Sequence, residues 1–297
     1  MQKKRNATGF NFSKIVIIES LKPSDSKTGK LLKTHLDQFS YDEGWSLLVE
    51  YTCCQTRLDV INTLCRLILG AKEMGEIPIL HFECHGNSRL GLICADDSLV
   101  DWEVLNSHLT SLNEATGFNL LAVFSACHGG HFLKNLSPLR PCPCWAMVGP
   151  TDVIDESDSM GGFRSFYRSV IKTRDIGLAA LALKGHALSK GRWLVQHSEV
   201  WFEDVVKNYI VKLCNKNSTR KRTKNLYRRS IAEGRRASIG SLKRNLKRTN
   251  RKNLSGEFFD SYFMLEKIPN NKIRFAEARA RMVKIIKELA ATGKYSI

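Results

Sequence analysis

The chain has 297 residues, 43% of them apolar and 25% charged, an ordinary globular composition for one large domain or two smaller ones. Its net charge of +17 would indicate a nucleic-acid or anionic-surface partner if it were spread evenly along the chain, which it is not. No run reaches the roughly 18 to 20 apolar residues of a membrane span, and the first residues are polar, so we expect a cytoplasmic protein without membrane contact.

Strands and helices are predicted to alternate along the first two thirds of the chain. Residues 1–13 are predicted to be flexible, and 21–40, rich in Lys, Ser and Thr, are predicted to be a loop. Apolar runs predict strands at 15–18, 77–82, 91–94, 98–100, 120–124 and 144–148. Helical spacing predicts helices at 58–75, 101–115, 160–170, 175–188 and 199–214. This alternation favours an α/β fold over 14–214, with a mostly parallel sheet flanked by helices on both faces.

The positive charge is concentrated between Lys216 and Lys252, where fifteen Lys or Arg residues and one acid, Glu233, give a net +14. Dense like charge and few apolar residues predict a basic flexible segment over 215–253, a linker without a packed core. Two other hypotheses stay open for residues 216–252: binding of nucleic acid or an acidic partner, and cleavage as an activation step. The helical spacing that resumes from Phe275 predicts a C-terminal helical tail over 254–297.

Two motifs carry residues with reactive side chains. The first is a buried strand that runs into His85-Gly86, and the second is a buried strand followed by Cys127 and a Gly129-Gly130 turn. Open α/β sheets bind ligands beyond the carboxyl ends of their strands, so we expect both side chains at one edge of the sheet. A thiol with its ordinary pKa of about 8.5 needs a nearby imidazole or helix N-terminus to act as a nucleophile. The pair therefore indicates a Cys127 nucleophile assisted by His85.

The pattern His-x-x-x-His-Gly at 81–86, followed by Ser-Ala-Cys-x-x-Gly at 125–130, resembles the CHAT branch of the caspase-like cysteine peptidases. The resemblance covers roughly residues 10 to 190. It implies a caspase-like peptidase domain over 14–214 that cleaves a protein substrate without a cofactor or metal. It also implies that Cys127 attacks the scissile carbonyl, that His85 assists proton transfer, and that the backbone amides of Gly86 and Cys127 form the oxyanion hole. Such peptidases resemble regulated effectors of bacterial defence pathways, which implies an activating partner protein.

Candidate specificity residues lie just before the nucleophile and in the loop after the next predicted strand. Metacaspases have an acid two positions before the nucleophile and caspases a glutamine, whereas this chain has Ser125, which does not support a preference for a basic P1 residue. Three acids in the loop after the next strand are hypothetical lining residues of the P1 pocket: Asp152, Asp155 and Asp158.

Two competing interpretations stay open. The first is a zinc site, although paired Cys-x-x-Cys knuckles are absent from the sequence; its ligands would come from Cys84, His85, Cys127, His128, His131, Cys142 and Cys144. The second is an inactive caspase-like scaffold that binds nucleic acid or a partner through its basic tail. The nine cysteines are odd in number and irregularly spaced, which favours reduced thiols, and His81 is expected to be a hydrogen-bonded core histidine.

Overall fold

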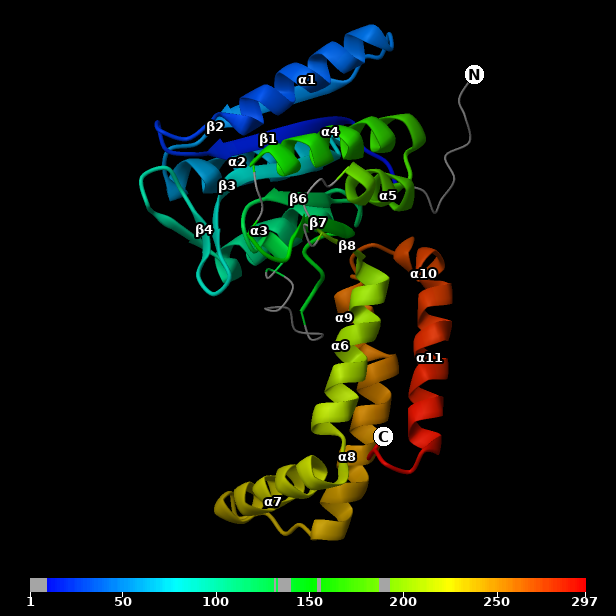
Figure 1. Cartoon of the computed structure of the whole chain (residues 1–297). Coiled ribbons are helices and arrows are strands. Elements are labelled where there is room, and N and C mark those ends of the chain that lie inside the picture. The colour runs from blue at the N-terminus through cyan, green and yellow to red at the C-terminus, as the bar shows by residue number, and fades with distance from the viewer. Residues whose placement is uncertain (1–9, 131, 133–139, 154–155, 187–192) are drawn as a thin grey trace. The chain divides into compact units, whose positions relative to one another are not determined.

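The computed structural model of the chain describes residues 10–130, 132, 140–153, 156–186 and 193–297 (Figure 1). They divide into two compact units: unit 1 holds the described residues of 1–136 and 142–197, and unit 2 holds those of 137–141 and 198–297. The division after His197 comes earlier than the boundary predicted near residue 215, because the helix from Ser198 contributes Phe202 to the core of unit 2. Among the described helices none is long and apolar enough to cross a membrane.

Unit 1 is built on an eight-stranded, mostly parallel sheet, which confirms the predicted α/β class and is consistent with a caspase-like fold. Its main path has the order β2-β1-β3-β6-β7-β8, with β8 antiparallel to β7 and with the β4–β5 hairpin attached to β3. The strands are β1 (Lys14–Ser20), β2 (Leu48–Cys53), β3 (Pro78–Asn87), β4 (Gly91–Ile93), β5 (Leu99–Asp101), β6 (Leu121–Ser125), β7 (Ala146–Pro150) and β8 (Trp193–His197).

Helices cover both faces of this sheet (Figure 1). One face carries α1, α4 and α5, which pack on one another, and the other carries α2 and α3, which also pack together. Every residue of β1 is buried, as expected for a central strand covered on both sides. The helices are α1 (Thr28–Asp42), α2 (Arg57–Met74), α3 (Trp102–Ala115), α4 (Glu156–Thr173) and α5 (Ile176–His186).

Three elements of unit 1 differ from the sequence prediction. The predicted loop over 21–40 contains most of α1, whose buried Leu32, Leu36 and Phe39 have the i, i+4, i+7 spacing of an amphipathic helix. The strands β2 and β8 were also not predicted. Both lie at the ends of the main strand path and are only partly buried, so their residues lack the continuous apolar run of a central strand.

Apart from an isolated bridge between Asn215 and Tyr295, the regular elements described in unit 2 are all helices. Its core is an aromatic cluster in which the Phe263 ring contacts Phe202, Phe259, Tyr262 and Phe275. The helices are α6 (Ser198–Leu213), α7 (Lys216–Ala232), α8 (Ile239–Ser255), α9 (Glu257–Tyr262), α10 (Asn271–Arg274) and α11 (Ala276–Ala291).

The segment predicted to be flexible is therefore helical, and the structure corrects that expectation. The side chain of Asn215 caps α7 by accepting a hydrogen bond from the Ser218 amide, and Ser238 caps α8 in the same way. On α8, Leu246 and Leu254 are buried at helical spacing. Local caps and a narrow buried face thus outweigh the like-charge repulsion from which a disordered linker was predicted.

Candidate active site

The two reactive residues come from neighbouring parallel strands, β3 and β6. In the register of these strands Glu83 lies opposite Ser125, and His85 and Cys127 each follow that pair by two positions. One step earlier Phe82 lies opposite Phe124, and their rings stack at 5.2 Å between centroids. Because the strands are held in this register, His85 and Cys127 leave the sheet at the same edge, as the sequence predicts. Both line one pocket of about 370 Å³.

The pocket lies where the order of the strands reverses. The chain runs from β1 outward to β2, then returns to β3 on the other side of β1 and continues toward β6 and β7. Open α/β sheets bind ligands at this switch point. Leu21, Ser24 and Asp25, which follow β1, form one wall of the pocket, and residues of β3 form the adjoining wall.

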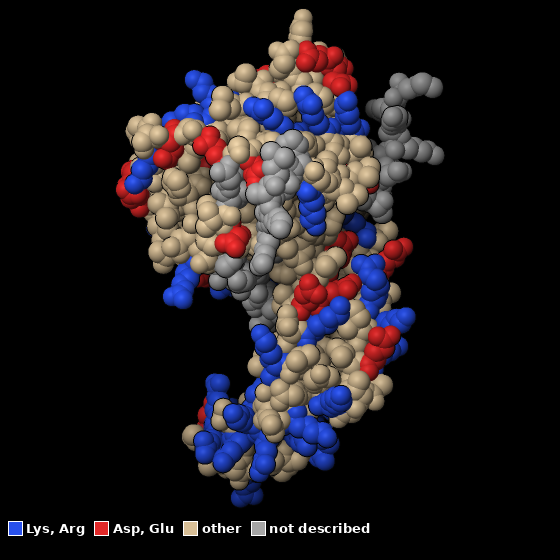
Figure 2. All heavy atoms as spheres, in the orientation of Figure 1, with Lys and Arg blue, Asp and Glu red and all other residues tan. Residues whose placement is uncertain are grey.

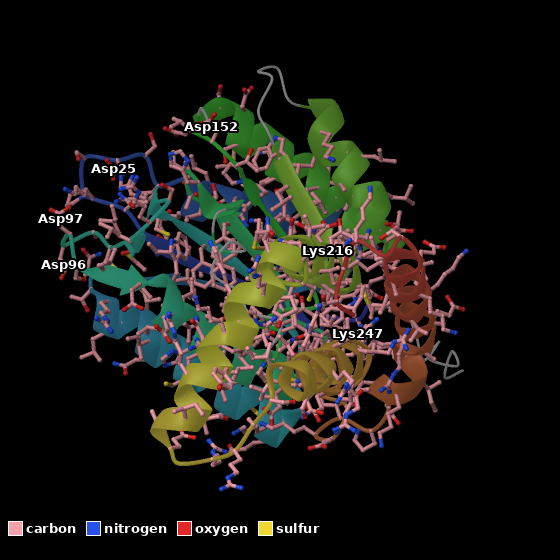
Figure 3. All side chains as sticks on the ribbon, turned by 90° about the horizontal axis from the view of Figure 1, so that it is seen from below. Asp25, Asp96, Asp97, Asp152, Lys216 and Lys247 are labelled. Carbon is pink, nitrogen blue, oxygen red and sulfur yellow. The ribbon has the colours of Figure 1, made fainter. Side chains whose placement is uncertain are left out.

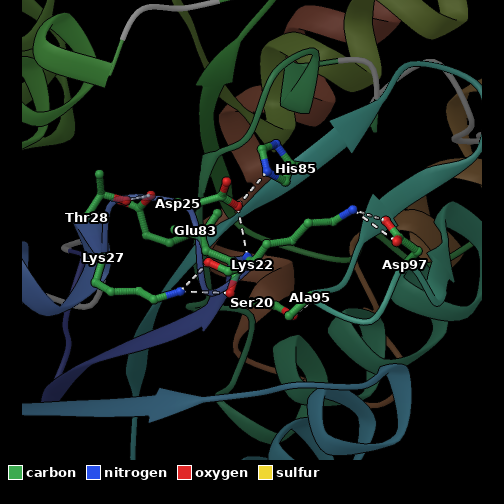
Figure 4. A network of polar contacts seen from close by, with 10 residues as sticks. Ser20, Lys22, Asp25, Lys27, Thr28, Glu83, His85, Ala95 and Asp97 are labelled. Atoms are coloured by element: carbon green, nitrogen blue, oxygen red, sulfur yellow. Dashed lines mark hydrogen bonds and ion pairs between the residues drawn. The ribbon is translucent and has the colours of Figure 1, made fainter.

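Asp25 orients the imidazole of His85 (Figure 4). Its Oδ2 atom lies 2.9 Å from His85 Nε2 and also accepts a hydrogen bond from the Lys22 amide at 2.8 Å. The hydrogen bond with His85 is the largest cause that lowers the pKa of Asp25, so this carboxylate is ionised at neutral pH. An ionised acceptor at Nε2 favours the tautomer with the proton on that nitrogen. The lone pair is then on Nδ1, which makes no hydrogen bond to any described residue.

Cys127 lies in a tight turn directly after β6. His128, the next residue, has a positive φ of 61°, an uncommon conformation for a residue with a side chain. The Gly129 amide closes the turn by donating to the Ala126 carbonyl at 2.9 Å. A Cβ atom on Gly129 would lie 2.6 Å from the Cβ of Phe124, so the turn packs against the strand only because this residue is glycine. The backbone around Cys127 is thereby fixed relative to β6.

Gly86 is in direct contact with this turn. A Cβ atom at Gly86 would lie 2.2 Å from the Cys127 carbonyl oxygen, a distance that atoms do not tolerate. The two chain segments that carry the predicted oxyanion-hole amides therefore touch, and glycine is the one residue that lets them approach this closely.

A buried polar network supports β3 beneath the pocket. His81 lies 2.9 Å from Glu83 through Nε2 and 2.9 Å from the Tyr167 hydroxyl through Nδ1, which confirms its expected role as a core histidine. The second oxygen of Glu83 accepts a hydrogen bond from the Thr28 hydroxyl at 2.8 Å, at the start of α1. Burial, followed by the nearby charge of Glu83, raises the pKa of Tyr167, so its phenol stays neutral. Both carboxylate oxygens of Glu83 are thus used within the protein.

The residues proposed from the sequence for specificity differ in position. Ser125 lines the pocket, and its hydroxyl is 3.0 Å from that of Ser159. Neither Asp152, which is exposed, nor Asp158, which is buried, is among the described lining residues, and Asp155 lies outside the described residues.

An acid that sequence reasoning missed lines the pocket instead. Glu156, at the start of α4, is exposed and makes no hydrogen bond or ion pair with any described residue. Asp25 was missed as well. The sequence shows it as an acid a few residues after β1, but only the order of the strands shows that β1 adjoins β3. For Glu156 the sequence contains no signal that distinguishes it from the neighbouring acids.

The zinc interpretation gains no support from the part of the chain that the structure describes. Within it, no three His, Cys, Asp or Glu side chains gather in a way that could hold a metal ion. The nine cysteines are free thiols, and His131 lies outside the described residues.

No protein-family model matches the chain, and no curated protein matches it. The resemblance to CHAT peptidases therefore rests on the two motifs and stays a prediction.

Proposed function

We propose that this chain is a caspase-like cysteine endopeptidase with Cys127 as nucleophile and His85 as its general base and acid. The observation that carries the proposal is the shared pocket: His85 and Cys127 line it from adjacent strand ends, and Asp25 hydrogen-bonds the imidazole from the side. A nucleophile, a base and a group that orients the base are the parts that covalent acyl transfer requires.

Acylation begins with transfer of the Cys127 thiol proton to His85 Nδ1, the nitrogen that the Asp25 hydrogen bond leaves basic. The thiolate attacks the scissile carbonyl carbon, and the carbonyl oxygen becomes an oxyanion that the amides of Gly86 and Cys127 stabilise. The imidazolium then gives its proton to the leaving amine as the C–N bond breaks. The products of this step are a free amine and a thioester on Cys127.

Hydrolysis reverses these roles. His85 takes a proton from a water molecule, whose oxygen attacks the thioester carbonyl. As the C–S bond breaks, the proton on His85 returns to the thiolate, and the enzyme is regenerated with a carboxylic acid product. Asp25 stays ionised throughout and stabilises the imidazolium in both steps.

The charge of the pocket favours a basic side chain at P1. Its described lining includes the carboxylates of Asp25, Glu83 and Glu156 and no Lys or Arg. The first two already accept hydrogen bonds from the protein, which leaves Glu156 as the acid available to a substrate cation. This assignment replaces Asp152, in the loop after β7, and Asp158, on α4, neither of which is among the described lining residues.

The substrate and the regulation follow from the resemblance alone. CHAT-type peptidases imply a protein substrate, an activating partner protein and a role as an effector in a bacterial defence pathway, in the cytoplasm. Nine free cysteines agree with a reducing compartment.

Active-site labelling tests the proposal. A peptide with a thiol-reactive acyloxymethyl ketone and Lys at P1 should add one probe mass to the wild type. It should not label Cys127→Ala, and it should label His85→Ala far more slowly. Cys65→Ala is the matched control, because Cys65 is an exposed thiol on α2 outside the pocket, and this variant should label normally. Retained labelling of Cys127→Ala would exclude Cys127 as the nucleophile.

The same experiment distinguishes the alternative function. If the chain is an inactive scaffold that acts through its basic helices, the probe should label no variant under any condition. Partner binding would then be the whole activity of the protein.

A further inference from the structure

The helix α7 carries a row of cations along one exposed side. Lys216, Arg220, Lys224 and Arg228 follow one another at four-residue spacing, and all four are exposed. With a rise of about 1.5 Å per residue, neighbours in this row are about 6 Å apart along the helix axis. The buried positions of the helix, Thr219 and Thr223, lie on an adjacent side, three residues after Lys216 and Arg220.

A second basic surface lies on α8, which packs against α7 within unit 2. It consists of two parallel rows of exposed residues, again at four-residue spacing: Lys243, Lys247 and Arg251, and Arg244, Arg248 and Lys252. Leu246, Asn250 and Leu254 are buried along the side of the helix that adjoins the first of these rows. Figure 2 shows Lys and Arg side chains gathered at the end of unit 2 that holds α7 and α8, and Figure 3 marks Lys216 and Lys247 on the two helices.

Most of these cations form no ion pair with the residues that the structure describes. Neither α7 nor α8 contains an Asp or Glu residue. Among the described residues, none of the four cations of the α7 row forms an ion pair, whereas on the α8 rows Lys252 pairs with Glu257 and Arg251 also interacts with another residue. Like charges at four-residue spacing repel and destabilise a helix. A bound anionic partner would offset that repulsion. The rows are therefore suited to binding an anion.

The chemistry of the surface distinguishes among anionic partners. On α8, Leu246 and Leu254 are buried in unit 2, and the exposed large apolar residue is Ile239, the first residue of the helix, so α8 offers no apolar face to insert into a lipid layer. Tyr227 is the one aromatic residue on the two helices, so stacking with unpaired bases would be weak. Regularly spaced Lys and Arg residues with few aromatic or exposed apolar neighbours are suited to a phosphate backbone, because such contacts neutralise charge without reading bases.

We propose that the exposed rows of α7 and α8 are a binding surface for duplex nucleic acid, which they contact through its phosphates. This function does not depend on the peptidase activity, because the surface belongs to unit 2 and the candidate active site to unit 1.

Fluorescence anisotropy of the full chain with labelled DNA and RNA duplexes of about 30 base pairs tests the proposal. Both duplexes should bind, and the logarithm of the association constant should fall linearly with the logarithm of the salt concentration between about 50 and 200 mM. Two double variants remove two cations each, Arg220→Gln with Lys224→Gln on α7 and Lys247→Gln with Arg248→Gln on α8. Each should weaken binding and reduce the salt slope by about two, one unit for each lost phosphate contact.

The matched control removes the same charge from another helix of unit 2. Lys284→Gln with Lys287→Gln changes exposed residues of α11, and it should leave both the affinity and the salt slope nearly unchanged. An equal loss in this control would overturn the proposal in favour of unspecific attraction by net charge. So would the absence of duplex binding at low salt.

Two further probes test the class of partner. Vesicles containing phosphatidylserine present a phosphate-bearing surface, and Ile231 and Ile239 are exposed apolar residues near the turn between α7 and α8. Poly-glutamate presents carboxylates on a peptide. Tighter binding of either probe than of the duplexes would overturn the nucleic-acid assignment. All measurements are repeated with Cys127→Ala, which should bind duplexes as the wild type does, so that this proposal and the peptidase proposal stand or fail separately.

Discussion

The α-carbon of Gly86 lies so close to the carbonyl oxygen of Cys127 that a Cβ atom there would be 2.2 Å from that oxygen. The His-Gly and Cys-containing motifs, about forty residues apart in sequence, therefore meet through their backbones. This contact makes the candidate site sensitive to changes of a single methyl group.

Gly86→Ala should reduce kcat/KM by about 100-fold or more. The added methyl group would push the Cys127 turn away from its position, so the thiolate would no longer be aligned with the scissile carbonyl. It should also lower the free energy of unfolding by about 1 to 3 kcal/mol, as overpacking does elsewhere. Gly185→Ala is the control, since a Cβ there meets no atom within 4 Å, and this exposed helical residue should tolerate the change. Peptidase assays and urea denaturation measure both effects. An active Gly86→Ala enzyme would contradict the assigned geometry.

Asp25→Asn should lower kcat by about 100-fold and leave KM nearly unchanged, because the loss affects the orientation and charge of His85 and not the binding of substrate. Asp97→Asn is the matched control: Asp97 forms an ion pair with Lys22 at 2.7 Å in the same region but does not contact His85 (Figure 4). Steady-state kinetics with a peptide substrate provide the measurement. An equal loss of kcat in both variants would indicate that the conformation of the loop, and not the Asp25 carboxylate, supports catalysis.

The pKa of Asp25 gives a stability prediction with a definite sign. Because the hydrogen bond with His85 lowers this pKa below its ordinary value of 3.8, the ionised form stabilises the folded state. That contribution is present above the unfolded pKa and is lost as the pH falls through the folded value. The difference in melting temperature between wild type and Asp25→Asn should thus be constant from about pH 5 to 8 and shrink below about pH 4. A difference that instead disappears near neutral pH would assign the effect to another group.

Glu156→Gln should reduce the preference for Lys over Gln at P1 by about tenfold, because it removes the one pocket carboxylate that no described residue engages. The control is Asp152→Asn, an exposed acid of the preceding loop that is not among the described lining residues. Two peptides that differ only at P1 provide the ratio of kcat/KM values. If Asp152→Asn changes the ratio and Glu156→Gln does not, the specificity pocket is formed by the loop after β7.

Leu254→Ala should destabilise the protein by about 2 to 5 kcal/mol, since this fully buried side chain of α8 would leave a cavity. Leu226→Ala on α7 removes a side chain that is 40% exposed, and it should cost less than about 0.5 kcal/mol. Chemical denaturation of both variants provides the comparison. Two equally mild variants would contradict the packing of α8 into the core of unit 2.

The sequence by itself determined the elements that local patterns encode. Apolar runs ending at His85-Gly86 and before Cys127 predict two buried strands with reactive residues at their ends, and β3 and β6 are found there. The Asp101 cap of α3 is likewise a local signal, and its side chain accepts a hydrogen bond from the Val104 amide. Such features depend on residues a few positions apart, so their physical causes are already present in the sequence.

Only the tertiary structure decided which residues share the pocket. The sequence shows an acid after β1, but the hydrogen bond between Asp25 and His85 requires β1 to be the neighbour of β3, which follows from the strand order. The choice of Glu156 over Asp152 depends on where α4 begins relative to the sheet. The helices α7 and α8 form because Thr219, Leu246 and Leu254 are buried in unit 2. This burial depends on contacts between residues far apart in sequence, so the composition, which shows mainly the repulsion between like charges, could not predict it.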